Sequence, residues 1–318
     1  MIVTVAMPVL NGGELFVRAL AAIRGQVLDA EVEILVCDSG STDGTPERAR
    51  EHGARVIEIA PERFGHGSTR NLLLAEARGS HVAITTADAE PADERWLAHL
   101  LSGFEQAQDV ALVYGPYIPR PGASPPVRRE IERWFSSIPP GVERLAPGER
   151  DIPAVELMGR RGFYTDANGC IARAAWERVP YRDVMYAEDR ALALDMLRAG
   201  YAKVYEPRAA VIHSHEYSSL QKLQRAFDEW YGLREVYGWR EPASPRHLAS
   251  QIRGELGALR REGAGPVTLA LAARDQALRL TGAVLGTRAE RLPGFVARRC
   301  SMAAAVTAAA SRAQRTGA

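Results

Sequence analysis

Residues 32–52 have the sequence VEILVCDSGSTDGTPERAREH, and this stretch decides the fold class. The apolar run Val32–Cys37 predicts a buried strand, and the polar residues 38–41 end it in a turn. A helix that runs to the end of the stretch begins at Thr42 or Asp43, both of which are good helix caps. The stretch is therefore one strand–turn–helix unit, the repeating unit of an α/β protein.

The same alternation continues on both sides of this unit. The expected strands are Ile2–Met7, Arg55–Ile59, His81–Thr86 and Val110–Tyr114, and the expected helices are Glu14–Gln26, Ser68–Ala77 and Glu94–Gln106. Strands joined by single helices imply right-handed crossovers and a largely parallel central sheet. Because such sheets bind ligands at the carboxyl ends of their strands, we expect the polar clusters at 38–43, 65–71 and 87–90 on one rim.

The second half of the chain is less regular. Residues 116–160 are rich in Pro, Gly and Arg, which predicts a long loop or mobile lid. The elements expected after it are a strand and short helix over Cys170–Arg178, a helix over Glu188–Ala199, strands at Ala202–Tyr205 and Ala209–His213, and helices from Ser219 onward, among them Val267–Leu285 and Phe295–Ala310. We expect an α/β domain over 1–237 and a basic, Ala/Arg-rich amphipathic extension over 238–318.

The net charge of +1 hides an asymmetry along the 318 residues. From Arg240 onward there are 13 arginines against 5 acidic residues, whereas the preceding part is acidic. A basic segment on an acidic body indicates an anionic partner, for which a membrane surface, a lipid phosphate or nucleic acid would each fit. The alternative is that the arginines only solvate amphipathic helices.

The cysteines and the N-terminal residues indicate the cellular compartment in which we expect the protein. Cys37, Cys170 and Cys300 are too few and too far apart for a disulfide framework or a zinc site, which favours a reducing cytoplasm. The start of the chain lacks the features of a signal peptide, and no apolar run approaches 18 residues, so we expect no membrane-spanning helix.

Two acidic pairs carry the strongest chemical signals. Asp88 and Glu90 lie two residues apart in a turn after a buried strand, and oxygen ligands of this kind suit Mg²⁺ or Mn²⁺. Glu188 and Asp189 begin a helix, where carboxylates also favour the helix dipole. The functional interpretation is that Asp189 acts as a general base on an acceptor hydroxyl, with Glu188 orienting the acceptor.

Two further stretches could contact phosphate or metal. Phe64–Asn71, FGHGSTRN, sets glycines and Arg70 at a helix start, which is a natural phosphate site, although a plain Gly-rich turn fits equally well. His213 and His215 follow a short strand and could complete a metal shell, although a His pair is more often structural. The sequence contains no Walker lysine loop, nucleophile elbow or Rossmann fingerprint, which disfavours P-loop NTPases, hydrolases and dehydrogenases.

Taken together and in this order, four motifs resemble glycosyltransferase family 2, whose members have the GT-A fold. They are VTVAMPVLN at 3–11, VCDSGSTDGT at 36–45, TADAEP at 86–91 and AEDR at 187–190, and the resemblance covers about residues 1–235. FGHGSTRN at 64–71, the stretch 185–207 and VIHSHEYS at 211–218 are similar to bacterial rhamnosyltransferase-like members that build surface polysaccharides. This narrower likeness implies dTDP-L-rhamnose as the donor.

The resemblance also implies roles for individual residues. The residues that would bind the nucleotide sugar are Pro8, Val9, Asn11, Asp38, Ser39, His66, Arg70, Asn71 and Asp88. Asp88 and Glu90 would hold the metal with help from His213 or His215, and Asp189 would be the base. Two departures from the family pattern are Ser39, where many members carry a second acid, and Glu90, which replaces the second Asp of the metal motif.

The sequence therefore predicts an inverting glycosyltransferase that uses Mg²⁺ or Mn²⁺ to move a sugar from a nucleotide-sugar donor to a glycan or lipid-linked acceptor. The expected location is the cytoplasm, on the inner face of the membrane, with the basic extension on anionic lipid and no nucleic-acid partner. A sugar-phosphate nucleotidyltransferase is the nearest alternative, but it would want a basic residue in the Val9–Gly13 loop. The other alternative is a non-catalytic scaffold that binds a nucleotide sugar. The presence of both Asp88 and Asp189 disfavours it.

Overall fold

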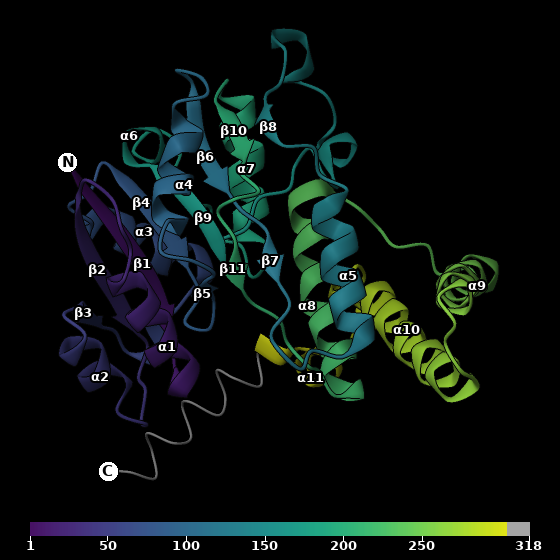
Figure 1. Ribbon diagram of the computed structural model, residues 1–318. Coiled ribbons are helices and arrows are strands. Elements are labelled where there is room, and N and C mark those ends of the chain that lie inside the picture. Colours follow the sequence, from purple (N-terminus) through teal and green to yellow (C-terminus); the bar gives the residue numbers. More distant parts are fainter. Residues whose placement is uncertain (304–318) are drawn as a thin grey trace. The chain divides into compact units, whose positions relative to one another are not determined.

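The computed structural model describes residues 1–303, and the contacts among its residues divide the chain into two compact units (Figure 1). The first unit contains residues 1–183 and 188–215, and the second contains 184–187 and the described residues from 216 onward. The helix α8 (Ser219–Tyr237) thus groups with the second unit, so the compact division falls before the expected domain boundary at 237.

The first unit is built on an eight-stranded sheet with the strand order β3-β2-β1-β4-β9-β6-β10-β8. Its strands are β1 (Ile2–Val9), β2 (Glu31–Asp38), β3 (Arg55–Glu58), β4 (His81–Thr85), β6 (Val110–Tyr114), β8 (Gly141–Glu143), β9 (Asn168–Ala172) and β10 (Ala202–Tyr205). The strands of the first α/β repeats pair in parallel, as expected. The strand β9 lies antiparallel between β4 and β6, and β8 lies antiparallel on β10.

Helices cover both faces of this sheet, because successive side chains of each strand point to opposite faces. Val3, Val5 and Met7 of β1 join one apolar cluster, whereas Ala6 joins the other. The first cluster includes residues of α1 (Gly13–Arg24), α2 (Thr45–Glu51) and α4 (Trp96–Phe104), and the second those of α3 (His66–Glu76), α6 (Arg173–Trp176) and α7 (Glu188–Arg198). Both faces are therefore buried, which explains the continuous apolar runs of the central strands.

A small second sheet stands beside the end of β4. It consists of β5 (Glu90–Pro91), β11 (Val211–Ile212) and β7 (Tyr117–Ile118), with β11 in the middle. Because β5 directly follows the Asp88 turn, its pairing with β11 brings that turn to the segment that contains His213 and His215.

The expectation of a long loop over 116–160 is wrong. The segment contains β7, the helix α5 (Pro125–Ser136) and the edge strand β8, with short 3₁₀ turns at Pro147–Glu149 and Ala154–Leu157. Ser124 precedes two prolines at the first helical positions, where proline is well tolerated. Ile131 and Phe135 then lie four residues apart on one side of the helix, a periodicity that the density of Pro and Arg conceals.

The second unit is helical. It contains α8, α9 (Pro245–Arg261), α10 (Pro266–Gly286) and α11 (Gly294–Cys300). A Cβ added to Gly282 or Gly286 would lie 2.3 Å from a carbonyl oxygen of α8, so these glycines let α10 lie directly against α8. The expected helix over Val267–Leu285 is confirmed. Of the helix expected over Phe295–Ala310, the structure has the part in α11, which ends at Cys300, and the end of that range lies outside the described residues. Within residues 1–303, none of the helices has the length and apolar character needed to cross a bilayer.

Candidate active site

The first candidate group is formed by Asp88, His213 and His215. In the small sheet Ile212 pairs with Glu90 in an antiparallel register. Two residues further along, the same register sets Ser214 opposite Asp88, and His213 and His215 flank Ser214 in the chain. The Asp88 carboxylate lies 3.5 Å from Nδ1 of His213 and 3.4 Å from Nε2 of His215. One potential ligand atom from each residue falls within 4.8 Å of the others, so the structure brings these three predicted residues together.

The electrostatics of this group suit metal ligation. Burial lowers the pKa of His213 to about 4, so its imidazole is neutral at pH 7 and keeps a lone pair for a ligand. Burial opposes ionisation of Asp88, yet the pKa of its carboxyl is lowered because His213, His215, the Thr86 hydroxyl and Arg120 face it. Asp88 is therefore anionic and His213 neutral, the protonation states that metal ligands require.

A divalent cation fits this donor set. Nδ1 of His213 is buried without a hydrogen-bond partner among the described residues. A buried polar atom of this kind calls for a partner, and a bound metal ion would supply one. One carboxylate and two imidazoles also form a donor set that transition metals accept, with Mn²⁺ among the ions that carboxylates suit. Asp88, His213 and His215 could thus hold the ion, with other positions left for a bound substrate.

Glu90 lies apart from this group. Its carboxylate is 2.7 Å from the Arg18 guanidinium of α1, and it is not one of the three clustered residues. Arg120 instead approaches Asp88, with its guanidinium against the Asp88 carbonyl oxygen and 3.8 Å from the carboxylate. Arg120 was missed because it sits in the stretch that the sequence pattern assigned to a loop.

The second candidate group is a buried cluster around Arg70. The Arg70 guanidinium is 5% exposed and lies 2.7 Å from Asp166 and 3.0 Å from Glu188. The Tyr181 hydroxyl donates to Asp166 at 2.6 Å, and His66 lies 3.8 Å from Glu188. The Arg70 guanidinium is thus already ion-paired with Asp166 and Glu188. Its contact with a diphosphate stays a prediction.

Asp189 lies next to this cluster, at the start of α7. Unlike Glu188 it keeps partial solvent access, and it accepts a hydrogen bond from the Arg190 backbone N–H at 2.7 Å. Burial and the neighbouring Glu188 raise the pKa of Asp189 to about 6, and burial raises that of Asp166 to about 8 despite Arg70. A carboxylate with a pKa near the working pH can both accept and release a proton.

Ala187, which directly precedes this acidic pair, has a left-handed backbone with φ of 64°. For a residue with a Cβ this conformation costs about 1–2 kcal/mol. Strain of this kind is held only where the surroundings fix it, and it often lies beside functional residues.

The residues predicted for the nucleoside lie at the carboxyl ends of β1 and β2. Val9 pairs with Asp38, and the Ser39 hydroxyl donates to the Val9 carbonyl oxygen at 3.1 Å. Oδ1 of Asp38 accepts two backbone N–H bonds, but its Oδ2 is buried with no partner among the described residues. An orphaned carboxylate oxygen at a strand end is suited to accept a hydrogen bond from a ligand. Pro8 precedes Val9 in the same strand.

Asn11 and Asn71 have structural partners. Asn11 adopts a left-handed φ of 51°, and its side-chain oxygen accepts from the Thr42 N–H at 2.9 Å, which ties the loop after β1 to the loop after β2. Asn71 accepts from Trp176 and bonds the Tyr181 backbone in both directions. Asn71 therefore fixes the segment that carries Tyr181, the partner of Asp166.

No separate sequence signal marks Asp166 or Tyr181. The string FYTDANG at 163–169 contains a single acid without a paired residue or a Gly-rich loop. Only the antiparallel insertion of β9 between β4 and β6 brings Asp166 beside Arg70 and Glu188, and that insertion depends on contacts between distant segments.

Comparison with known sequences identifies the family of this chain. The profile of glycosyl transferase family 2 matches residues 4–164. The O-antigen chain rhamnosyltransferase WbaN of Salmonella anatum is 32% identical over 200 residues, 62% of this chain and 61% of the relative. The O-antigen chain rhamnosyltransferase RfbN of Salmonella typhimurium is 30% identical over 231 residues, 71% of this chain and 70% of the relative.

Solved structures support the fold. The mannosyltransferase PcManGT from Pyrobaculum calidifontis, in complex with GDP-Man and Mn²⁺, has a TM-score of 0.53 at 21% identity, covering 98% of this chain and 79% of that one. Residues 1–349 of TarS from S. aureus give a TM-score of 0.52 at 14% identity, covering 92% and 91% of the two chains. The expected GT-A fold with a helical C-terminal region is confirmed. Because the family profile spans half of the sequence and RfbN is similar over most of its own length, this chain belongs to glycosyl transferase family 2.

Proposed function

We propose that this glycosyltransferase moves L-rhamnose from dTDP-L-rhamnose to an acceptor hydroxyl, with inversion at the anomeric carbon, during the synthesis of a surface polysaccharide or glycolipid. The donor and pathway are supported by the likeness to WbaN and RfbN, both of which are named O-antigen chain rhamnosyltransferases. The observation that carries the chemistry is the convergence of Asp88, His213 and His215 beside the carboxyl end of β4.

The nucleoside would sit at the ends of β1 and β2. Oδ2 of Asp38 is free to accept an N–H from the base or a hydroxyl from the ribose. Pro8, Val9, Asn11 and Ser39 would form the wall around it, with His66 and Asn71 supporting the sugar side.

Asp88, His213 and His215 would hold a divalent cation, and we favour Mn²⁺ over Mg²⁺. Imidazole ligands suit transition metals better than Mg²⁺, which prefers oxygen and water. Mn²⁺ is present in the structures of PcManGT and of glucosyl-3-phosphoglycerate synthase from Mycobacterium tuberculosis. When bound, such an ion neutralises charge on the diphosphate leaving group. Glu90 remains a candidate ligand through water, although its carboxylate is paired with Arg18.

Asp189 would act as the base. The acceptor oxygen forms its bond to the sugar C1 as the bond from C1 to the diphosphate oxygen breaks, and the acceptor proton passes to the Asp189 carboxylate. The pKa of about 6 leaves this carboxyl mostly ionised at pH 7. Glu188, which is ion-paired with Arg70, would orient the acceptor or fix the position of the neighbouring Asp189.

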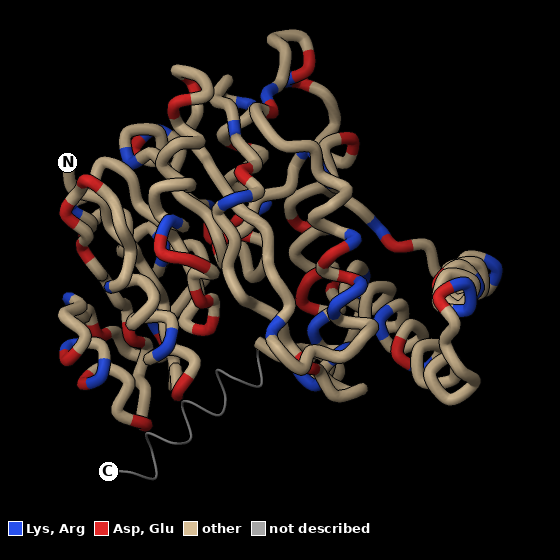
Figure 2. The backbone as a smooth tube through the Cα atoms, in the orientation of Figure 1, with Lys and Arg blue, Asp and Glu red and all other residues tan. Residues whose placement is uncertain are grey.

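The basic extension would dock on the inner face of the cytoplasmic membrane, near a lipid-linked acceptor. Figure 2 shows Lys and Arg along the helices of the second unit, and Val267, Leu271 and Phe295 are exposed there. Arginine beside exposed apolar side chains suits anionic lipid. Sedimentation with vesicles of anionic lipid tests this: Arg260→Gln with Arg261→Gln should weaken binding, and equal binding would count against docking. The functional division at 237/238 stays a prediction.

A donor panel tests the proposed reaction. The full chain is incubated with Mn²⁺ or Mg²⁺ and several nucleotide sugars, and release of nucleoside diphosphate is measured. We expect dTDP-L-rhamnose to give the fastest release. Pyrophosphate as the product would support the nucleotidyltransferase alternative, and no release from any donor would support the scaffold.

A further inference from the structure

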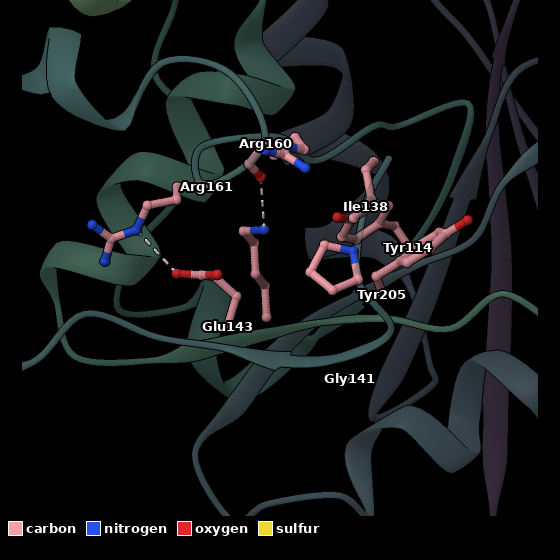
Figure 3. Close-up of a pocket in the computed structure, with 9 residues that line it drawn as sticks. Tyr114, Ile138, Gly141, Glu143, Arg160, Arg161 and Tyr205 are labelled. Atoms are coloured by element: carbon pink, nitrogen blue, oxygen red, sulfur yellow. Dashed lines mark hydrogen bonds and ion pairs between the residues drawn. The ribbon is translucent and has the colours of Figure 1, made fainter. Parts of the chain in front are cut away.

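A separate cavity lies at the edge of the main sheet where β8 pairs with β10. It has a volume of about 240 Å³ and is partly open to solvent, and Figure 3 shows Tyr114, Tyr205, Glu143, Arg160 and Arg161 around it. Lys203 of β10 also lines it. The cavity shares no residue with the two candidate groups of the active site, so the proposed function leaves it unexplained.

Lys203 is buried in this cavity. It is 3% exposed, and its ammonium donates to the Arg160 carbonyl oxygen at the long distance of 3.4 Å. The ammonium also lies 5.3 Å from the centre of the Tyr114 ring. An ammonium has three donors, and burial without good partners is costly, so a buried lysine calls for compensation.

The carboxylates nearby are already engaged by another residue. Glu143 stands directly opposite Lys203 in the β8–β10 register, yet its carboxylate pairs with Arg161 at 3.2 Å. Arg161 also pairs with Glu149 at 3.2 Å. Within residues 1–303, no carboxylate lies within 4.0 Å of the side-chain nitrogens of Lys203 or Arg160, which leaves two cations of the lining without an anionic partner.

A hydroxyl of the lining is also unsatisfied. Tyr114 is 1% exposed, and its hydroxyl has no hydrogen-bond partner among the described residues. Tyr205 offers its hydroxyl only to a carbonyl oxygen at 3.4 Å. Arg160 is exposed, and its guanidinium donates to the Ser137 carbonyl oxygen. The cavity thus combines two cations that have only carbonyl oxygens as hydrogen-bond partners with two phenol hydroxyls, a set that matches an anion with several oxygens.

We propose that this cavity binds a phosphate group, either as inorganic phosphate or as the end of a phosphate monoester. Its volume exceeds that of a single water, which takes about 30 Å³ in the liquid, and lies below the range of about 300–1,000 Å³ that is usual for drug-sized ligands. A compact, multiply charged oxyanion fits that size, and it would neutralise both Lys203 and Arg160.

The protonation of Lys203 supports this assignment. Burial lowers the pKa of Lys203 to about 8, and the positive charges of Arg190 and Arg161 act in the same direction, whereas Glu143 opposes them. Glu143, Arg160, Arg161, Tyr114 and Tyr205 also line the cavity. Burial raises the pKa of both phenols, so they stay protonated at neutral pH. A bound anion favours the charged ammonium, so phosphate should raise the pKa of Lys203.

The composition of the chain makes this measurable. Lys203 and Lys222 are the only lysines among the 318 residues, so NMR of lysine labelled with ¹⁵N at Nζ should contain two side-chain signals. Lys222 pairs with Asp275 in the second unit and serves as the internal control. The signal of Lys203 is assigned by its loss in Lys203→Met.

The experiment titrates the full chain with inorganic phosphate and, in a second series, with glucose 1-phosphate. We expect saturable shifts of the Lys203 signal and a rise of its pKa by about one unit, with Lys222 unchanged. The series with the tighter response identifies the free anion or the monoester as the ligand. Asp88→Asn should leave the shift intact, which separates this cavity from phosphate binding at the active site.

A matched pair of arginine variants completes the test. Arg160→Gln keeps the backbone carbonyl that holds Lys203 but removes the guanidinium, and should weaken phosphate binding about tenfold, as expected for a charge-assisted bond. Arg144→Gln, at an exposed pair with Asp109, should not change it. About 50 mM phosphate is far above the dissociation constant expected of such a site, so an unchanged Lys203 signal at that concentration would overturn the proposal. Equal phosphate binding by Arg160→Gln and wild type would overturn it as well.

Discussion

Two groups of acidic residues in the first unit have opposite electrostatics. Asp88 lies beside two histidines, with Arg120 3.8 Å from its carboxylate, and its pKa is lowered. Asp166 and Glu188 surround Arg70, with Asp189 next to them, and the pKa values of Asp166 and Asp189 are raised. An aspartate is thus held in its ionised form in the first group, whereas the second group favours the protonated form of Asp166 and Asp189.

The difference follows from what surrounds each carboxylate. A single carboxylate that faces two histidines, a hydroxyl and Arg120 stays ionised and can take up a cation. Three carboxylates near one buried guanidinium carry excess negative charge, so burial and mutual repulsion make part of the group retain a proton. We therefore assign cation binding to the first group and proton transfer to the second.

Replacing the proposed base should have the largest effect. We expect Asp189→Asn to lower kcat about 10²–10⁴-fold, because the acceptor proton loses its acceptor, while donor affinity is unchanged. Steady-state kinetics and calorimetry with the donor measure the two quantities. Glu51→Gln, at an exposed acid of α2, is the control; full turnover by Asp189→Asn would show that another group is the base.

Removing the charge of Arg70 should test the second group as a structural unit. Arg70→Met leaves Asp166 and Glu188 buried without their cation, which should lower the free energy of unfolding by about 3–5 kcal/mol. Urea denaturation measures the change. Asp166 keeps its proton below its pKa of about 8, so the loss should grow as the pH rises through 8 and this carboxyl becomes charged. A loss independent of pH would mean that packing alone is responsible.

The raised pKa of Asp166 predicts a pH dependence of stability in the wild type. The folded carboxyl keeps a proton up to a pKa of about 8, whereas the unfolded one loses it near 3.8, so the folded state binds more protons in between. Stability should therefore fall as the pH rises through this window, by about 1–2 kcal/mol between pH 6.5 and 8. Urea denaturation of Asp166→Asn should show a flatter profile, and an equally steep one would refute the assignment.

Glu90 should give the smallest effect. Its carboxylate pairs with the half-exposed Arg18, and such pairs are worth about 0.2–1 kcal/mol, so Glu90→Gln should change stability and Mn²⁺ affinity only slightly. Calorimetry with Mn²⁺ measures the affinity. A loss of Mn²⁺ affinity in Glu90→Gln as large as that in Asp88→Asn would show that Glu90 is a direct ligand. The two residues would then not differ in the way proposed.

Local patterns in the sequence predicted the strand–helix alternation and singled out Asp88 and the pair at 188–189, whose roles stay predictions. Each of these depends on a few neighbouring residues, such as the apolar run before Asp88. The association of His213 with Asp88 was only suggested, because it depends on the pairing of β11 with β5, more than a hundred residues apart.

The features that were missed depend on longer-range contacts or on a concealed pattern. Asp166 reaches Arg70 only because β9 inserts antiparallel into the sheet. The helix α5 was hidden by prolines that in fact occupy its first turn. Lys203 looked like an ordinary strand residue, since only the pairing of β10 with β8 encloses it.

Binding of Mn²⁺ tests the assignment of the two acidic groups most directly. Calorimetry or electron paramagnetic resonance would compare wild type, Asp88→Asn and Asp189→Asn in the presence of a nucleoside diphosphate. We expect one bound Mn²⁺ in wild type and in Asp189→Asn, and none or very weak binding in Asp88→Asn. Undiminished binding by Asp88→Asn, or its loss in Asp189→Asn, would contradict the account.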